Sequence, residues 1–524
     1  MACIETVPIE SPYTKRSQGN FFLYALGRLC FKPLMYLLNW LPSSYLLPWY
    51  YSSTRAPQQK LTALPLEIIT AILNELDWCD LLKVRMVCKC LNDISRTRGV
   101  WTTQYYRYAM EKKLRPRLEE PLGSYSAEEL ERWVLMRRSA DLGWSFGSSE
   151  PPQKRWIRHH STPATFLVQG GRWLLVGGDN GSITAYDLDV SEVSGTELIP
   201  PQGTANPQPV RWISIDIEET ASKLTFTLSL SPRLPQRHAE SPSLNIRIYK
   251  VTLCGHGSDA YLTACLLNSF SANEQAKVRS TSLLGRLFVR TMFTTHRNRS
   301  YIEVFDWMES TSSLHRRTTI FPQEVTACVH ILPNNRLLAV SLEHLLVFNL
   351  GELDNEDPVA PAFPQTTTVP QWTVPYDGLQ TCQSDCLPSF SGVQASYFVL
   401  NSGNAIHGLI IPHVSDQPPH LVELMQLPHK SVYSFIGFEK AIVEYLDGSS
   451  IDMLSFTWEQ PSTTSESRST DAISPSKPQP KGRNLRFSWQ NASVVMDEET
   501  GRIAAKDEND RPSEEVADKV LNWL

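Results

Sequence analysis

Apolar residues recur every three to four positions between residues 61 and 101, which is the spacing of one face of an α-helix. Pro65 stands where the first turn of a helix would begin. The apolar stripe after it consists of Ile68, Ile69, Ile72, Leu73 and Leu76. Asp77 and Asp80 bracket a break, and a shorter pattern continues towards Trp101 through Leu81, Leu82, Val84, Val87, Leu91 and Ile94. The pattern predicts three short helices. A unit of about 40 residues rarely supplies a sufficient core alone, so another chain or the next domain is expected to cover it.

The stretch LPLEIITAILNELDWCDLLKVRMVCKCLNDI followed by VW combines a Leu-Pro-x-Glu-Ile opening, a Leu-Asp pair, an Asp-Leu-Leu turn, a Val-Cys-Lys segment and a late tryptophan. In these features it resembles an F-box over residues 61–101, and it departs at Cys90-Leu91, where many members have an aromatic residue. The resemblance implies binding to the Skp-type adaptor of cullin-based ubiquitin ligases. The adaptor contact that it implies consists of Leu64, Pro65, Ile68, Leu81, Leu82, Val84 and Val87. An ordinary helical subdomain is the alternative.

The first 60 residues are expected to form an apolar arm ahead of the F-box at 61–108. The run from Phe21 to Tyr51 is long enough to span a bilayer, but Arg28, Lys32 and Pro33 interrupt it. Membrane insertion and an interfacial membrane helix are therefore alternatives. The preferred interpretation is a helix docked on the protein or a disordered arm.

Beyond a polar, helix-compatible linker at 109–150, apolar and polar residues alternate with a period of two, which is typical of β-strands. In RWLLVGGDNGSITAYDLD, two strand-like runs flank the hairpin turn sequence Asp179-Asn180-Gly181. Such units have turns near Asn180, His238, Arg297, His344, Gly403, Gly448 and Thr500. Their mean spacing of about 53 residues is slightly longer than a four-stranded blade. The expected fold class is α+β multidomain, with a small α-helical F-box followed by an all-β, seven-bladed β-propeller at 151–510.

Three of these units end in an aromatic residue followed by Asp or Asn, at Tyr186-Asp187, Phe305-Asp306 and Phe348-Asn349. This is similar to the closing dipeptide of WD-repeat proteins, although their Gly-His element is missing. An eight-bladed ring or a pair of stacked sheets remains an alternative. Residues 459–482 are rich in Ser, Thr and Pro and are expected to be a disordered loop, in which Ser474 could be phosphorylated. Residues 511–524 are expected to be a C-terminal tail.

Composition narrows the classes of function. The formal charge of −6, with acidic residues scattered, disfavours general nucleic-acid binding. The ten cysteines lack a zinc-site pattern, which favours a reducing compartment, cytoplasm or nucleus, and no metal or other cofactor is expected. CGHGSD, from Cys254 to Asp259, brings His, Ser and Asp together in sequence only, without the strand–turn–helix context of a nucleophilic serine.

Together these features predict a non-enzymatic substrate-receptor subunit of a Skp–cullin–F-box ubiquitin ligase. Its F-box would bind the adaptor, and its propeller loops would bind a client protein. No client-binding residue is predicted, because strand order decides which loops share a face. The alternative is an adaptor-bound scaffold outside ubiquitin transfer, associated with membranes through residues 21–51. A propeller hydrolase is disfavoured by the missing site chemistry.

Overall fold

The computed structural model describes residues 61, 64–112, 116–146, 153–160, 164–203, 208–232, 244–272, 276–294, 299–357, 366–376, 389–445, 451–458, 483–485, 494–507 and 515–522. The chain divides into two compact units, Met1–Ile72 and Leu73–Leu524. The arm predicted for residues 1–60 and the loop predicted for 459–482 lie outside the described residues.

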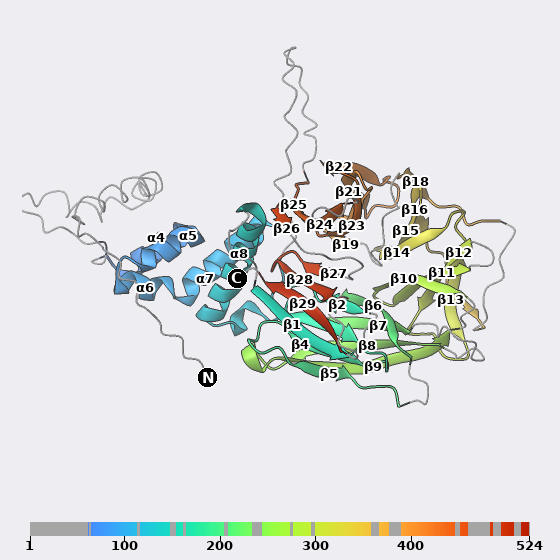
Figure 1. Ribbon diagram of the computed structural model, residues 1–524, viewed down its shortest axis with the longest axis horizontal. Coiled ribbons are helices and arrows are strands. Elements are labelled where there is room, and N and C mark those ends of the chain that lie inside the picture. The colour runs from blue at the N-terminus through green and yellow to red at the C-terminus, as the bar shows by residue number, and fades with distance from the viewer. Residues whose placement is uncertain are drawn as a thin grey trace, which may run out of the picture. The chain divides into compact units, whose positions relative to one another are not determined.

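The helices come first in the chain (Figure 1). They are α4 (Leu66–Glu75), α5 (Trp78–Arg85), α6 (Lys89–Ser95), α7 (Arg98–Glu111), the 3₁₀ turn η2 (Leu122–Ser124) and α8 (Ala127–Phe146). Helix α5 begins after Asp77 because the Asp77 carboxylate accepts a hydrogen bond of 2.8 Å from the backbone N–H of Asp80. The predicted helices are therefore confirmed, and α7, which contains Trp101, is a further one. None of the described helices is long and apolar enough to cross a membrane.

Six antiparallel sheets of the β-domain are formed by strands close together in the chain. The first is β2 (Thr165–Leu167), β3 (Trp173–Gly177), β4 (Ile183–Asp187) and β5 (Gly195–Ile199). The second is β6 (Val210–Ile217), β7 (Thr225–Pro232), β8 (Leu244–Cys254) and β9 (Tyr261–Ala272), with the 3₁₀ turn η3 (Gly257–Asp259) before β9. The third is β10 (Lys277–Leu284), β11 (Leu287–Thr294), β12 (Arg299–Asp306), β13 (His315–Ile320) and β17 (Asp354–Glu356).

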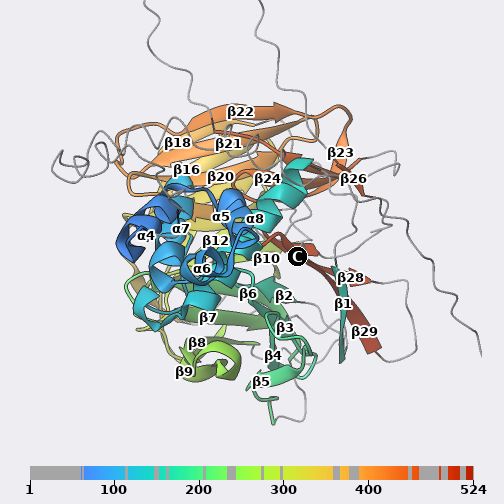
Figure 2. The same ribbon diagram turned by 90° about the vertical axis from the view of Figure 1, so that its left-hand side faces the viewer.

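The fourth sheet is β14 (Thr326–Leu332), β15 (Arg336–Ser341), β16 (His344–Asn349) and β18 (Trp372–Pro375). The fifth is β19 (Ser389–Ser391), β20 (Ala395–Asn401), β21 (Ala405–Pro412) and β22 (His420–Gln426). The sixth is β23 (Ser431–Ile436), β24 (Lys440–Tyr445), β25 (Ile451–Ser455) and β26 (Arg483–Leu485). Contacts between sheets include β6 with β10 and β10 with β14, so the first strands are the inner ones. Strands β6 to β9 follow one another outward (Figures 1 and 2). This is a β-propeller, and these six sheets are its blades.

A further sheet has a different origin, because it combines strands from both ends of the domain. Its order is β1 (Gln153–His160), β29 (Glu515–Asn522), β28 (Arg502–Asp507) and β27 (Val494–Asp497). Strand β27 contacts β23 on one side and β2 on the other. We call it the closing sheet, since it joins the last blade to the first.

The closing sheet corrects two predictions. The first six predicted hairpins are the second and third strands of a blade, whereas the hairpin near Thr500 is the first and second strand of the closing sheet. The expectation of seven equivalent blades is therefore corrected to six blades and a closing sheet. The tail predicted at 511–524 instead contains β29, which pairs with β1 from Gln153↔Asn522 to His160↔Glu515. Pairing between strands so far apart leaves no local sequence pattern.

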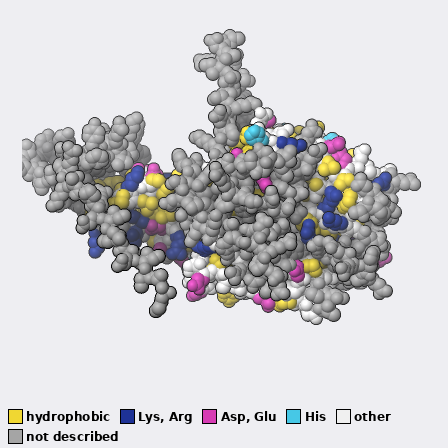
Figure 3. All heavy atoms as spheres, viewed as in Figure 1, with side chains coloured by type: hydrophobic (Ala, Val, Ile, Leu, Met, Phe, Trp, Pro, Cys, Tyr) yellow, Lys and Arg dark blue, Asp and Glu magenta, His cyan; other side chains and the backbone are white. Residues whose placement is uncertain are grey.

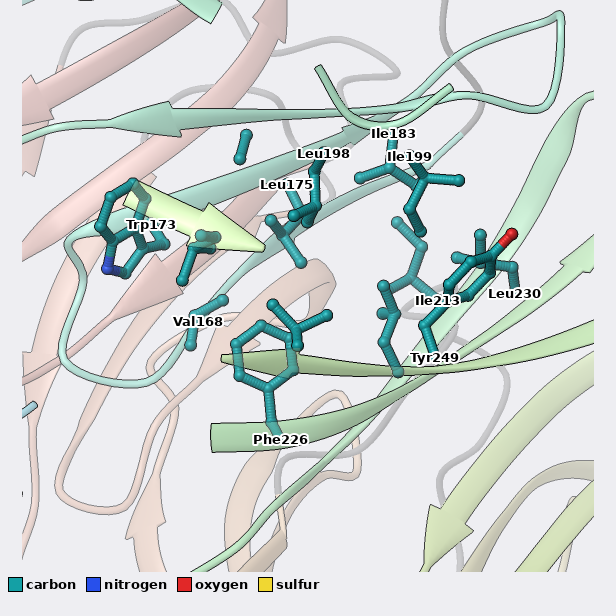
Figure 4. Packing of buried hydrophobic residues seen from close by; sticks show 14 of the residues in the cluster. Val168, Trp173, Leu175, Ile183, Leu198, Ile199, Ile213, Phe226, Leu230 and Tyr249 are labelled. Atoms are coloured by element: carbon teal, nitrogen blue, oxygen red, sulfur yellow. The ribbon is translucent and has the colours of Figure 1, made fainter. Parts of the chain in front are cut away.

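The core lies between neighbouring blades. In Figure 4, Trp173 and Leu175 of β3 lie near Phe226 of β7, and all three belong to one buried cluster. Every residue of β3 and of β15 is buried. Strands covered on both faces are mostly apolar, which explains the run WLLVG of β3 and the central LLAV of β15.

Candidate interaction surfaces

Three of the seven residues predicted to contact an adaptor lie in the first unit, around the start of α4. Leu64 and Ile68 are half-buried and Pro65 is exposed. Leu66, which was not predicted, is 57% exposed. The beginning of α4 therefore offers apolar surface to a partner.

The other four predicted residues belong to the second unit, on α5 and just after it. Leu82 and Val84 are half-buried and Val87 is 53% exposed. Leu81 is fully buried, so it supports this surface from within. Sequence reasoning missed Met86, which is 82% exposed and hydrophobic. Hydrophobic side chains are visible over the helices in Figure 3. An adaptor contact through these residues remains a prediction.

Helices α5 to α8 are held together around Arg85. Its guanidinium donates to the Glu131 carboxylate of α8, with Nη2 to Oε2 at 2.9 Å, and to the Ser95 hydroxyl at 2.9 Å. It also lies 5.3 Å from the centre of the Trp101 ring. The charge-assisted hydrogen bond between Arg85 and Glu131 thereby connects the hydrophobic surface near Val87 to α8.

The linker predicted at 109–150 docks on the propeller, and Arg172 is the first anchor. It lies between β2 and β3, where it donates to Glu119 at 2.9 Å, to Asp187 at 2.7 Å and to the carbonyl oxygen of Gly257 at 2.7 Å. The Glu119 carbonyl accepts from the backbone N–H of Leu224 at 2.6 Å. Burial raises the pKa of Glu119 to about 7, and the neighbouring Arg172 charge works against that rise.

His256 is the second anchor, in the turn between β8 and β9. Its Nδ1 contacts the Glu120 carboxylate and its Nε2 lies 3.1 Å from Glu129 Oε1. Glu129 is held by a capping box at the start of α8, in which Ser126 N–H donates to its carboxylate at 2.7 Å. Glu120 also pairs with Lys223 at 2.8 Å. The pKa of His256 is raised, and the hydrogen bond to Glu120 is the largest of the effects that raise it. These contacts favour the charged ring, because only the imidazolium can donate from both nitrogens.

Helix α8 supplies further anchors along its length. Arg137 pairs with Glu499 at 3.3 Å, and its guanidinium stacks 3.7 Å from the centre of the Trp133 ring. Asp141 accepts from Lys440 at 2.8 Å. Burial would raise the pKa of Asp141, but the charges of Lys440 and Lys112 lower it overall.

All these propeller partners lie on one face. Consecutive antiparallel strands alternate in direction, so the turns after first strands and after third strands share a face. Lys223 follows the first strand β6, His256 follows the third strand β8, and Glu499 follows the first strand β27. We call this the linker face. Hydrogen bonds and ion pairs connect residues 116–146 to this face of the propeller. The opposite face, where first strands begin, we call the open face.

None of these anchors was predicted from the sequence. His256 belongs to CGHGSD, but its ring contacts Glu120 and Glu129, so the geometry supports docking rather than a catalytic triad. Its partners are distant in sequence and leave no spacing signal. Within the described residues, no group of three or more His, Cys, Asp or Glu side chains could hold a metal ion.

The F-box-like family model matches residues 61–107. No curated protein matches the chain. Among solved structures, the chain is similar to the β-propeller domain of Myceliophteria thermophila Cps50 (Swd1), at 12% identity and a TM-score of 0.40, covering 71% of this chain and 99% of that one. It is also similar to the WD40 repeats of RRP9, at 11% identity and a TM-score of 0.38, covering 71% and 99%. These TM-scores are too low to carry a functional conclusion.

The chain therefore carries an F-box-like motif at 61–107 ahead of a β-propeller. This combination is typical of non-enzymatic interaction proteins. In general terms it suggests a substrate receptor that binds an adaptor through its helices and a protein client through its propeller.

Proposed function

We propose that this protein is the substrate receptor of a Skp–cullin–F-box ubiquitin ligase. The F-box-like helices would bind the Skp-type adaptor, and the propeller would bind a client near the ubiquitin-bearing partner. Ubiquitin transfer would be performed by the other subunits, so the contribution of this chain is proximity. We propose the cytoplasm or the nucleus as its location.

The observation that carries the proposal is the continuous connection from helices α5 and α6 to the propeller. Arg85 ties α5 to α8 through Glu131, and α8 and the segment before it are tied to the linker face by Arg172, His256 and Arg137. A receptor needs such a connection, because a client gains from proximity only if it is held at a defined distance from the reacting partner.

The direct test is co-purification of the adaptor with the double variant Leu64→Ala and Pro65→Ala. Adaptor recovery should fall by at least tenfold, because a few residues carry most of the energy of a small interface. The matched control is Leu266→Ala with Leu267→Ala, which removes exposed leucines from β9 instead. Recovery at the wild-type level with the F-box variant would contradict the assignment.

The competing proposal is an adaptor-bound scaffold outside ubiquitin transfer, associated with membranes through residues 21–51. Reconstitution with adaptor, cullin and ubiquitin-charged enzyme separates the two. A receptor should support ubiquitin transfer to a co-purifying client, and loss of transfer should accompany loss of adaptor. Adaptor binding without cullin recovery, together with membrane retention that requires residues 21–51, would favour the scaffold.

A further inference from the structure

Arg211 and Arg279 occupy equivalent positions in neighbouring blades. In β6, Val210 pairs with Pro232 and Trp212 pairs with Ser231, so residue 211 has no partner residue on β7. In β10, residue 279 is left out between Val278↔Met292 and Ser280↔Thr291. Each arginine is therefore the extra residue of a β-bulge near the start of an inner strand. Bulges change the direction of a side chain and are common beside functional sites.

Both guanidinium groups rest on aromatic rings. Arg211 Cζ lies 5.4 Å from the centre of the Trp212 ring, and Arg279 Cζ lies 4.1 Å from the centre of the Phe293 ring. Stacking on a ring orients the planar donors while leaving them available to an acceptor.

Neither arginine has a hydrogen-bond or ion-pair partner among the described residues, in contrast to Arg172 or Lys440 on the linker face. Burial lowers the pKa of Arg279. A half-buried cation without a counter-ion is costly to maintain in a folded protein. With respect to the described residues, the donors of both half-buried cations are available to an anionic ligand.

The two arginines share one neighbourhood. Trp212, on which Arg211 rests, belongs to the same buried cluster as Val278 and Met292. Val278 directly precedes Arg279 in the chain, and Met292 directly precedes its ring partner Phe293. Lys277 and Arg299, also without described partners, are exposed at the same ends of β10 and β12. This local positive charge contrasts with the net charge of −6 of the whole chain.

These residues lie on the open face, because they stand where first strands begin, and the linker docks on the other side. We propose that Arg211 and Arg279 bind carboxylates of an acidic, extended segment of the client. This rests on the proposed receptor function and names the chemistry of its client. Each arginine presents one planar fork, which matches the two oxygens of a carboxylate. Nucleic acid would be recognised by a more extensive basic surface.

The test uses the full chain bound to its adaptor and a fluorescein-labelled oligoglutamate peptide, followed by fluorescence anisotropy. Oligoglutamate should bind in a salt-dependent way, and an oligoglutamine peptide should not. Each arginine-to-alanine change should weaken binding about tenfold, and the double variant more. Arg211→Lys and Arg279→Lys should each lose only part of the affinity, since the charge remains without the fork. If the alanine variants fail to fold, the two lysine variants still measure what the guanidinium contributes to binding.

The matched control is Arg286→Ala, which removes an exposed arginine between β10 and β11 on the linker face and should leave peptide binding unchanged. Equal loss in this variant, or wild-type binding in the double variant, would overturn the proposal. Binding that requires a phosphoserine peptide, or that prefers single-stranded DNA, would overturn it too. Adaptor co-purification separates the two proposals: if adaptor binding is lost while arginine-dependent peptide binding persists, only the receptor function fails.

Discussion

The two faces of the propeller treat charged residues in opposite ways. On the linker face, Arg172 and Lys440 pair with the linker carboxylates of Glu119 and Asp141. In the opposite direction, Arg137 of the linker pairs with Glu499 of this face. On the open face, Arg211 and Arg279 have only aromatic rings as described partners. Paired, partly buried charges specify one arrangement of two elements, whereas unpaired cations are available to a ligand. The ion pairs give the linker face an architectural role, and the binding role of the open face is what we propose.

The largest expected effect comes from breaking an anchor of the linker face. Arg172→Ala should lower the free energy of unfolding by about 3–5 kcal/mol, because it leaves the half-buried carboxylates of Glu119 and Asp187 without their cation. Urea denaturation followed by circular dichroism measures the loss. The control Arg132→Ala removes an exposed i,i+4 pair within α8 and should cost only about 0.5 kcal/mol. Similar losses for both variants would show that Arg172 is no anchor.

A smaller effect is expected where the closing sheet meets the first blade. Gly171 has φ of +71°, and a Cβ there would lie 2.1 Å from Thr500 Oγ1. Gly285 has φ of +56° with nothing within 4 Å of such a Cβ, so it is a matched control for backbone strain. Gly171→Ala should therefore destabilise the protein by roughly 1–3 kcal/mol more than Gly285→Ala. Equal melting temperatures for the two variants would argue against a tight closure.

The smallest effect is the pH dependence of the His256 anchor. The pKa of His256 is raised in the folded protein, so its stabilisation is fully present below the ordinary value of 6.5 and is lost as pH rises through the raised pKa. His256 is 44% exposed, and its pairs should contribute less than about 1 kcal/mol. The difference in unfolding free energy between wild type and His256→Gln should shrink from pH 6 to pH 8.5. A difference that is constant with pH would exclude a charged His256 in this anchor.

The free energy of unfolding of the His256→Gln variant has to be subtracted from that of the wild type, because neighbouring groups titrate in the same pH interval. Burial raises the pKa of Glu119 and of Glu498 to about 7. A carboxyl group with a raised pKa contributes stability at low pH that is lost as pH rises through its folded value. These contributions have the same sign as that of His256, and they cancel in the difference between the two proteins.

Local features of the fold were predictable because they depend on neighbouring residues. The apolar spacing after Pro65 predicted α4, and Asp77 is the cap that begins α5. The hairpin at Asp179-Asn180-Gly181 is the β3–β4 turn. The hairpin near Thr500 was also found, but its place within a sheet was not, because a hairpin looks the same whichever two strands of the sheet it supplies.

The sequence by itself determined the elements and the F-box-like motif, since periodicity and turn residues act over a few positions. Tertiary structure alone decided the rest. It paired β1 with β29, brought Glu120 and Glu129 to His256, and placed Arg211 and Arg279 on the face opposite the linker, without an ion-pair partner among the described residues. The physical reason is that ring closure and charge pairing join residues far apart in the chain, and whether a charge finds a counter-ion depends on which face its strand end occupies.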